Sequence, residues 1–439
     1  DGTLELLLSE QLNRGYPALT PDCPQAHMFE REIFEQHDVL PHGHPWLKPV
    51  RFHAPYRKNS GAAPRALLPG VCDYFRVKGE EIHEVAVGPV HAGIIEPGHF
   101  RFQCNGENVF HLEIELGYQH RGLERAVVDN PARRLFYMEA AAGDTTVAHA
   151  LAYCRAVQAL GDGAPGKRTE ALRAAGLELE RLANHVGDLG ALAGDVGYLP
   201  TMSYCGRLRG DFLNMTALLC GSRFGRGLVC ESGVRQPLSD KTAEEILKRL
   251  KDAASDVENA AALLWDTPSV RARFEETGCV QARQAAEMGL VGPAARASGL
   301  DKDARRDFPS GYYVTRRNFQ PAICHSGDVY ARAKVRMLEI RDSLELLRLA
   351  LPQAVGPQEE LPLSKFAPDS LAVAVEEGWR GEICHVARTD SGGEIDFYKI
   401  ADPSFKNWPG LALALRGQQI SDFPLCNKSF NLSYCGHDL

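Results

Sequence analysis

The stretch AGDTTVAHALAYC, residues 142–154, has the residue spacing of a metal-binding turn but lacks the cysteines of such a turn. Gly143 and His149 stand at the spacing of such a turn, whereas Ala142 and Thr145 occupy the two places where thiolates belong. Thiolates are the ligands that soft transition-metal sites require. The stretch therefore predicts a turn that has been kept without its metal. His149 is then either a core or helix-capping histidine bonded to backbone, or a group with a chemical role.

A carboxylate and an imidazole stand close together in the stretch EPGHF, as Glu96 and His99. Such a pair can relay protons beside a redox centre, because burial and neighbouring charges tune both groups toward neutral pH. The alternative is a turn glutamate and a half-buried histidine without chemistry. His91 is open to the same two interpretations.

The twelve cysteines are spread evenly, and no two of them are closer than nine residues. The CxxC spacing and the other close spacings of zinc and iron–sulfur sites are therefore absent. We expect these cysteines to be small buried hydrophobic residues, and we expect this chain to hold no cluster of its own.

Length and composition indicate an ordinary globular chain. It has 439 residues, 44% hydrophobic and 24% charged, which is enough for two or three domains. The net charge of −8, without a basic run, argues against nucleic acid as a partner. No apolar run approaches the ~18 residues of a membrane span, and no signal peptide is evident. The sequence starts at Asp1 without a methionine, so we expect further residues upstream, in a protein that is cytosolic or held at a membrane by partners.

The pattern along the chain predicts an α+β fold, a long-helix bundle with small peripheral antiparallel sheets. A short acidic helix and a Pro/Gly/His-rich turn come first, then a linker-like stretch at 53–70. A β region at 81–116 contains Asn-Gly, the strongest hairpin signal. Apolar residues at helical spacing follow over 131–352, including a stripe from Leu172 to Ala193, a helix with a Thr242/Glu245 capping box and a helix around 333–351. Short strands with an SGG turn at 368–402 precede an extended tail, 403–439.

Several of these stretches together resemble a known family. They are VGPVHAGIIEPGHFRFQCNGENVF, GYQHRGLERA, VGPAARASG, NWPGLALALRG and ISDFPL. They resemble the large subunit of membrane-bound, formate-hydrogenlyase-type (group 4) nickel–iron hydrogenases, which is homologous to the quinone-pocket (D-type) subunit of complex I, NADH-quinone oxidoreductase. Residues 1–55, with EREIFEQHDVLPHGHPWLK, resemble the end of the C-type subunit of complex I, which such hydrogenases carry fused in front. The resemblance implies a linker at 56–70 and a hydrogenase-like, D-type domain at 71–439.

The resemblance also shows what the chain has lost. In those hydrogenases a CGxCxxxH loop and a terminal DPCxxC stretch hold nickel and iron through four cysteines. The matching positions here are Ala142, Thr145, Ser433 and Gly436, and Cys435 lies one place off register. We therefore expect no bound metal and no hydrogenase activity.

The quinone site of complex I is similarly incomplete. There a tyrosine and a histidine hold the quinone headgroup, and the matching positions here are Gly143 and Ile95. Asp195 matches the acidic residue that partners that histidine. Quinone remains one possible acceptor, through other donors.

The motif GYQHRGLER is intact. In both families this segment faces the last 4Fe–4S cluster, which a separate small subunit carries, so the resemblance assigns His120 and Arg121 to that role. A cation beside a cluster stabilises its reduced state and raises its potential. The alternative is a surface His-Arg pair at a strand-to-helix turn. The resemblance also places Glu96 and His99 on the proton route.

We therefore predict a peripheral subunit on the cytoplasmic side of a bacterial or archaeal membrane, which is inactive alone. It would belong to a complex that resembles NADH-quinone oxidoreductase, and the resemblance also assigns NAD binding and proton translocation to that complex. Its expected partners are a B-type small subunit with the 4Fe–4S cluster, a ferredoxin-like (I-type) subunit, and H-type and antiporter-like membrane subunits. Electrons would reach a polar, hydrated pocket bounded by the Glu96–His99 hairpin, the 142–149 turn, Asp195 and the C-terminal tail. Alternatively, the chain is a non-catalytic scaffold that couples the cluster to ion movement in the membrane arm.

Overall fold

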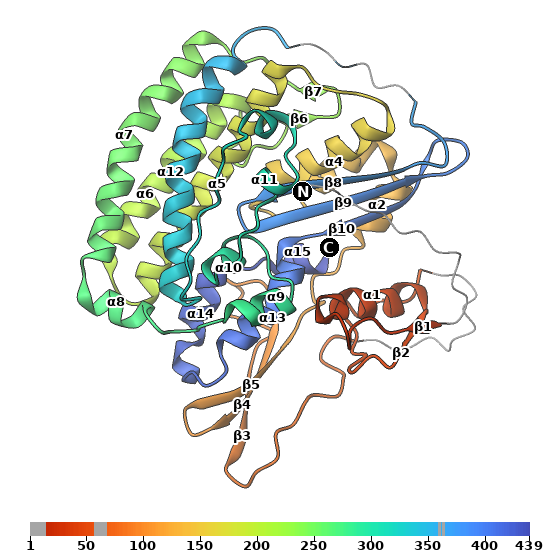
Figure 1. Cartoon of the computed structure of the whole chain (residues 1–439), viewed down its shortest axis with the longest axis vertical. Helices are drawn as coiled ribbons and strands as arrows, with labels where there is room; N and C mark the ends of the chain where they lie inside the picture. Colours follow the sequence, from red (N-terminus) through yellow and green to blue (C-terminus); the bar gives the residue numbers. More distant parts are fainter. Residues whose placement is uncertain (1–14, 57–67, 359–360, 362–364) are drawn as a thin grey trace.

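Four long helices form the main body of the molecule in the computed structural model, which describes residues 15–56, 68–358, 361 and 365–439. They are α5 (Lys167–Asp195), α6 (Leu199–Cys220), α7 (Asp240–Trp265) and α12 (Val329–Ala354), packed side by side (Figure 1). α5 packs against both α6 and α12. Its predicted stripe from Leu172 to Ala193 is confirmed, since every residue of the stripe is at most 1% exposed.

The start of α7 differs from the prediction. The helix begins at Asp240, and its N-cap is Ser239, whose hydroxyl accepts a hydrogen bond from the Thr242 amide at 3.1 Å. The predicted Thr242/Glu245 capping box is therefore wrong. Glu245 accepts instead from the Arg249 guanidinium one turn later, at 2.7 Å. A serine one turn upstream of Thr242 satisfies the free amides first.

A three-stranded antiparallel sheet lies beside the bundle. Its order is β10-β9-β8, with β8 at Leu371–Gly378, β9 at Gly381–Thr389 and β10 at Ile395–Ala401. The predicted short strands are confirmed. Helix α4 (Thr146–Leu160) packs on β8 and β9, and α2 (Leu123–Asp129) packs on β10 (Figure 1).

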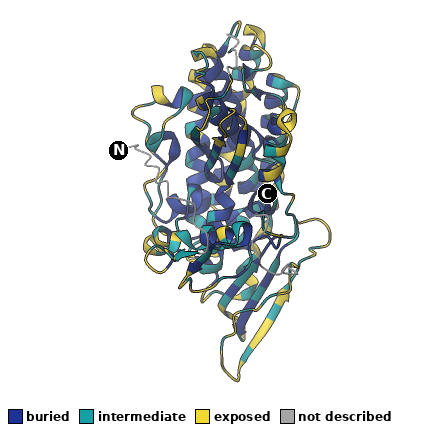
Figure 2. Ribbon diagram, turned by 90° about the vertical axis from the view of Figure 1, so that its right-hand side faces the viewer, coloured by how far each residue is buried: buried dark blue, intermediate teal, exposed yellow. Residues whose placement is uncertain are grey.

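A second antiparallel sheet projects from the body, with β4 between its two neighbours. It contains β3 (Ile82–Val87), β4 (His99–Asn105) and β5 (Asn108–Glu115). The Asn-Gly turn between β4 and β5 is confirmed, with Gly106 at φ +54°. Figure 2 shows the far end of this sheet exposed, whereas β4 buries Phe100 and Phe102 against the body.

The C-terminal region is helical, so the predicted extended tail is wrong. It forms α13 (Pro403–Ala414), α14 (Phe423–Phe430) and α15 (Tyr434–Asp438). Asp402 caps α13 by accepting from the Ser404 amide at 2.7 Å, and Pro403 follows at the first helical position, where its ring is favourable.

The N-terminal segment packs against this C-terminal region. It contains α1 (His27–His37) and a parallel pair, β1 (Gly15–Pro17) with β2 (Leu40–His42), where only antiparallel sheets were expected. The Arg51 guanidinium donates to the His437 carbonyl at 3.0 Å. Residues 57–67 of the predicted linker lie outside the described residues.

The remaining elements are short. The α-helices are α3 (Arg134–Met138), α8 (Pro268–Phe274), α9 (Ala282–Glu287), α10 (Gly292–Ala297) and α11 (Ala304–Asp307). The strands are β6 (Val229–Cys230) and β7 (Gly233–Val234), and the 3-10 helices are η1 (Pro24–Ala26), η2 (Pro131–Arg133), η3 (Gly311–Thr315) and η4 (Ile420–Asp422). Within the described ranges, every helix is too short or too polar to cross a membrane.

Candidate functional site

The turn before α4 and the C-terminal α15 meet at one place, which we call the frame: residues 139–146, 379–381 and 431–438. The Arg121 side chain ties its two ends together. Its guanidinium donates to the carbonyls of Ala140 (2.7 Å), Ala141 (2.8 Å) and Cys435 (3.2 Å). The Cys435 thiol in turn lies against the Gly143 backbone and the Glu96 carboxylate. The two segments that carry the degenerate ligand positions are therefore neighbours.

The third segment of the frame is the two-residue turn Trp379-Arg380 between β8 and β9, where Gly378 pairs with Gly381. α10 holds this turn at very close range. A Cβ on Gly292, which has φ +64°, would lie 2.2 Å from the Arg380 carbonyl oxygen. Only glycine allows this backbone contact, so the position of Arg380 is fixed by the main chain.

Arg380 fills the centre of the frame. Its guanidinium makes a bidentate pair with the Asp144 carboxylate, at 2.6 and 2.8 Å, and donates to the Asn431 carbonyl at 2.5 Å. It also stacks on the Trp379 ring, 3.9 Å from the centroid. Burial opposes ionisation of Asp144, but the Arg380 charge outweighs it and holds the pKa of that carboxyl below its usual value. The frame thus contains a neutralised ion pair.

The degenerate ligand positions have acquired polar partners. The Thr145 hydroxyl accepts from the Trp379 indole at 3.1 Å and from Arg380 at 3.2 Å. The Ser433 hydroxyl caps α15 by accepting from the Gly436 amide at 2.9 Å. These side chains therefore serve local structure.

The donor set does not fit a nickel–iron centre. Position 436 has no room for a cysteine, because a Cβ there would lie 2.7 Å from the Asp402 carboxyl carbon. Burial and the neighbouring Glu96 raise the pKa of the Cys435 thiol, which disfavours a thiolate. Within the part of the chain that the structure describes, no three His, Cys, Asp or Glu side chains are arranged to hold a metal ion.

The cavity next to Asp144 is small. The cavity next to Asp144 has about 10 Å³ and is lined by Glu180, Asn184, Thr216 and Arg223, among others. A cavity needs at least about 10–15 Å³ to hold one water. The polar, hydrated pocket bounded by the Glu96–His99 hairpin and the C-terminal tail stays a prediction; next to Asp144 itself, the Arg380–Asp144 pair fills the position with paired polar groups rather than apolar ones.

Glu180 on α5 is the one strongly perturbed acid beside this cavity. Its carboxylate accepts from the amides of Val147 (2.7 Å) and Ala148 (3.3 Å) at the start of α4. Burial raises its pKa to about 8 against the effect of these two amides. Glu180 was not among the predicted site residues.

Comparison with known proteins shows what this chain is similar to. Residues 195–362 match the model of the respiratory-chain NADH dehydrogenase 49 kDa subunit. The chain is 28% identical to formate hydrogenlyase subunit 5 of Escherichia coli over 95% of its length and 76% of the relative's. It is 28% identical to the membrane-bound hydrogenase subunit alpha of Pyrococcus furiosus (79% of this chain, 85% of the relative) and to NADH-quinone oxidoreductase subunit 4 of Thermus thermophilus (78% and 90%).

The chain is a relative of the group 4 hydrogenase large subunits and of the D-type subunits of complex I. The predicted resemblance is thereby confirmed. At the positions that the resemblance matches to the metal ligands of such hydrogenases, this chain carries Ala142, Thr145, Ser433 and Gly436, and Arg380 lies beside them.

Asp195 lies away from the 142–149 turn, beside which the resemblance predicts it. It is exposed at the end of α5, near Lys428 of α14. Asn184, whose amide donates to the Asp144 carbonyl, is 11 residues earlier, or about 16 Å along the helix. Asp188, two turns before Asp195, is the buried acid instead: it accepts from Arg336 (2.7 Å) and from Asn431 (2.5 Å).

Glu96 and His99 face different neighbours. Glu96 approaches Cys435, beside the frame. His99 stands next to Phe100 in β4 and so points to the opposite face of the sheet, toward the Tyr74 ring, with its Nε2 buried and unbonded. The structure therefore does not bring the expected acid–imidazole pair together. His91 bonds the Gly98 carbonyl at 2.8 Å, which is a structural role within the loop.

His120 and Arg121 lie at the connection from β5 to α2, and Arg121 is exposed. His120 bonds the Asp438 carbonyl at 2.8 Å and stacks on His53, with ring centroids 4.6 Å apart. The Arg121 guanidinium is held by the frame, as described above. The side chains of His120 and Arg121 thus both link this surface to the frame.

His149 is fully buried but bonds side chains rather than backbone, so the backbone-bonded interpretation is wrong. Its Nε2 lies 3.0 Å from an Asp402 oxygen and its Nδ1 lies 3.1 Å from His385 Nε2. The partners Asp402 and His385 were missed, because they are 253 and 236 residues away in sequence. The one available signal was the Asp-Pro pair at 402–403, which marks a helix start.

Proposed function

We propose that this chain is a peripheral subunit of a membrane-associated, hydrogenase-related oxidoreductase complex of the complex I type. In that complex it docks a small subunit that carries a 4Fe–4S cluster, and it couples the redox change of the cluster to proton movement. The relatives support a subunit role, because their names describe subunits of a formate hydrogenlyase, a membrane-bound hydrogenase and NADH-quinone oxidoreductases.

One observation carries the docking assignment. Arg121 is exposed, yet its guanidinium is held in place by the carbonyls of Ala140, Ala141 and Cys435. A fixed cation at the surface suits a neighbouring cluster, whose reduced state is the more negative one. The same side chain contacts both ends of the frame. A change of charge on the partner's cluster would therefore change the electrostatic interaction of a side chain that is bonded to the frame.

The complex is not a hydrogenase in this proposal. The thiolates that nickel and iron require are missing, and the Arg380–Asp144 pair occupies the space between the former ligand positions. The ferredoxin-like and membrane subunits expected from the resemblance would then serve electron supply and ion movement.

The small cavity favours a second candidate, a non-catalytic coupling scaffold. Pockets for drug-sized ligands measure about 300–1,000 Å³, whereas the cavity beside Asp144 measures about 10 Å³. A quinone headgroup beside Asp144 would need this cavity to open. If it does not open, the chain transmits the redox state of the cluster without accepting electrons.

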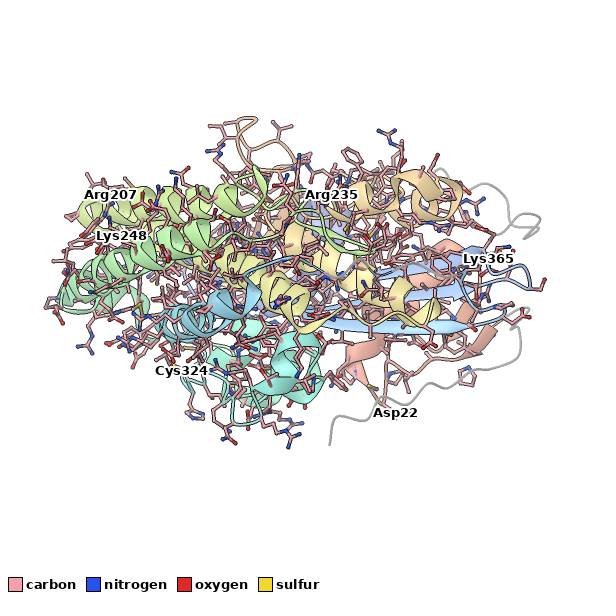
Figure 3. All side chains as sticks on the ribbon, turned by 90° about the horizontal axis from the view of Figure 1, so that it is seen from above. Asp22, Arg207, Arg235, Lys248, Cys324 and Lys365 are labelled. Carbon is pink, nitrogen blue, oxygen red and sulfur yellow. The ribbon has the colours of Figure 1, made fainter. Side chains whose placement is uncertain are left out.

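The experiment is co-purification of the full chain with its neighbours, with the cluster followed by paramagnetic resonance. Arg121→Glu should reduce recovery of the cluster-carrying subunit at least tenfold, because it places a negative charge against a reduced cluster. The matched control is Lys248→Glu, on the outer side of α7 (Figure 3), which is exposed and far in sequence from the frame. Equal loss with both variants, or recovery of the chain without any iron–sulfur partner, contradicts the proposal.

A further inference from the structure

A network of buried charged side chains connects α5 and α12 to α10, α11 and the end of β8. Ion pairs of 2.6 to 3.8 Å join its members into one group, and each member is at most 4% exposed. The network contains three arginines, four carboxyls and one histidine: Arg181, Arg296, Arg305, Glu178, Asp303, Glu339, Glu377 and His185. None of these residues belongs to the frame or to the surface at Arg121, so the function proposed above does not use them.

The charges of this network balance only if it holds one proton. Its three guanidiniums carry three positive charges, its four carboxyls carry four negative charges when all are ionised, and a neutral imidazole adds none. Burying an unbalanced charge is costly, and a buried group takes up a proton rather than remain charged. The folded chain should therefore hold one proton in this network near neutral pH.

His185 is a poor place for this proton. Its Nε2 donates to the Glu339 carboxylate at 2.9 Å, which a neutral ring already allows. Its Nδ1 is buried without a hydrogen-bond partner in the part of the chain that the structure describes, so a proton there would add a charged and unbonded N–H. Burial accordingly lowers the pKa of His185. The proton therefore belongs to one of the four carboxyls.

Glu377 is the carboxyl with the fewest donors. It accepts from Arg296 Nη1 at 2.8 Å and from the Ala304 amide at 3.0 Å, whereas each of the other three carboxyls accepts three hydrogen bonds. Burial opposes ionisation of those three, but the neighbouring guanidiniums outweigh it and hold the pKa of each below its usual value. Three ionised carboxyls then match the three arginines.

Glu377 also shares a donor with a second carboxyl. Arg296 Nη1 lies 2.8 Å from Glu377 Oε1 and 3.1 Å from Asp303 Oδ2, so two acids meet at one nitrogen. Two carboxylates that share a site disfavour each other's ionisation, and Asp303 is the one that the Arg305 guanidinium holds as an anion, at 2.6 and 2.9 Å. Burial, with a contribution from Asp303, raises the pKa of Glu377 to about 7.

Other charged groups face the network from the elements packed against it, and most of them are paired. Glu382 on β9 stands opposite Glu377 in the strand register and pairs with Lys406. The remaining groups are Glu376 with Arg155, Arg336 with Asp188, Arg332 near Asp328, and the half-buried Asp342 near Arg305. The pairs add no net charge, so the count within the network stands.

We propose that Glu377 is a buried proton-binding site, which holds the one proton that balances this network. Glu377 stands directly before the turn that carries Trp379 and Arg380, and Arg181 donates to the carbonyls of Glu377 (2.7 Å) and Gly378 (3.0 Å). Loss of the proton would therefore place a negative charge at the base of the frame. The site supplies a proton-binding group for the proposed coupling role, but the charge balance does not depend on that role.

The test is infrared spectroscopy of the full chain with ¹³C-labelled glutamate at pH 6, which detects the carbonyl stretch of a protonated glutamic acid. Because Glu180 also holds a proton at this pH, the parent and all variants carry Glu180→Gln. The parent should show a band that shifts with the label and in D₂O, and most of it should disappear at pH 8. Glu377→Gln should remove this band. Glu376→Gln is the matched control, since its side chain is equally buried but paired with Arg155, and it should leave the band unchanged.

A urea midpoint at pH 6 gives an independent readout. Glu377→Gln replaces one neutral group by another and should leave the midpoint close to that of the parent, whereas Glu339→Gln removes an ionised partner of Arg296 and should lower it clearly. A band that survives Glu377→Gln, or one that shifts with ¹³C-aspartate instead, overturns the assignment. So does a midpoint that falls as far in Glu377→Gln as in Glu339→Gln. Because no partner is present, these outcomes are distinct from a failure of docking at Arg121.

Discussion

The Arg380–Asp144 pair offers the sharpest quantitative prediction, through a double-mutant cycle of Arg380→Met and Asp144→Ala. The Arg380 side chain is 5% exposed, whereas that of Asp144 is 34% exposed. Exposed pairs contribute about 0.2–1 kcal/mol, and breaking a fully buried pair costs about 3–5 kcal/mol. Since water reaches one side of Asp144, we expect a coupling energy between these limits, about 2 kcal/mol. Arg380→Met also loses the bonds to Thr145 and Asn431, at about 1 kcal/mol each, so its total cost is about 4 kcal/mol.

The assay is equilibrium unfolding in urea of the wild type, both single variants and the double variant. A matched control cycle uses Arg388→Met and Asp396→Ala, a bidentate pair on the same sheet at 2.9 and 2.7 Å whose side chains are 55% and 36% exposed. The control should give at most about 1 kcal/mol and should weaken in about 1 M salt, because exposed charges are screened. Equal coupling in the two cycles would refute the claim that Arg380 and Asp144 are the centre of the frame.

The other predictions concern acid groups, metal content and the backbone. Glu180→Gln keeps an acceptor for the amides of α4 but removes a group whose pKa is about 8 in the folded chain. Between pH 4.5 and 8 the folded state holds that proton, whereas the unfolded state has lost it. Through this group, the free energy of unfolding of the wild type should therefore fall by up to about 1.4 kcal/mol for each unit that the pH rises. The variant should lack this contribution to the slope when unfolding is measured from pH 5 to 8, and identical slopes would contradict the assignment. Elemental analysis of the purified chain should find nickel far below stoichiometric amounts, and near-stoichiometric nickel would reverse the interpretation of the donor set. Gly292 has φ +64°, and Gly292→Ala places a Cβ 2.2 Å from the Arg380 carbonyl oxygen, so it should lower the free energy of unfolding in urea by about 2 kcal/mol or more. The control Gly206→Ala, on α6 with open space around it, should not destabilise the chain.

Local patterns in the sequence were sufficient for much of the fold. The stripe from Leu172 to Ala193 repeats at helical spacing over many turns, and Asn105-Gly106 suits a tight turn between strands. Such signals depend on neighbours within a few residues. In the helical C-terminal region, α14 and α15 were missed because they are only eight and five residues long, too short for a period to be evident.

Contacts between distant segments could not be obtained in this way. Asp144 and Arg380 are 236 residues apart, and nothing in either local stretch indicates the other. Asp188 and Asp195 illustrate the same limit on one helix. Residues seven apart lie on nearly the same face, so the pattern cannot distinguish them. Only the placement of Asn431 and Arg336 beside Asp188 decides which acid is buried.

The most direct test of the proposed function is a redox titration, by paramagnetic resonance, of the partner's cluster in the intact complex with Arg121→Met. Removing the cation costs the reduced cluster more than the oxidised one, so the midpoint potential should fall; a loss of about 1 kcal/mol corresponds to about 40 mV for one electron. Arg121→Lys should keep most of the wild-type potential, and Arg125→Met, an exposed arginine of α2 paired with Asp129, should not change it. An unchanged midpoint in Arg121→Met, with the cluster still present at its wild-type content, would contradict the claim that this surface faces a 4Fe–4S cluster.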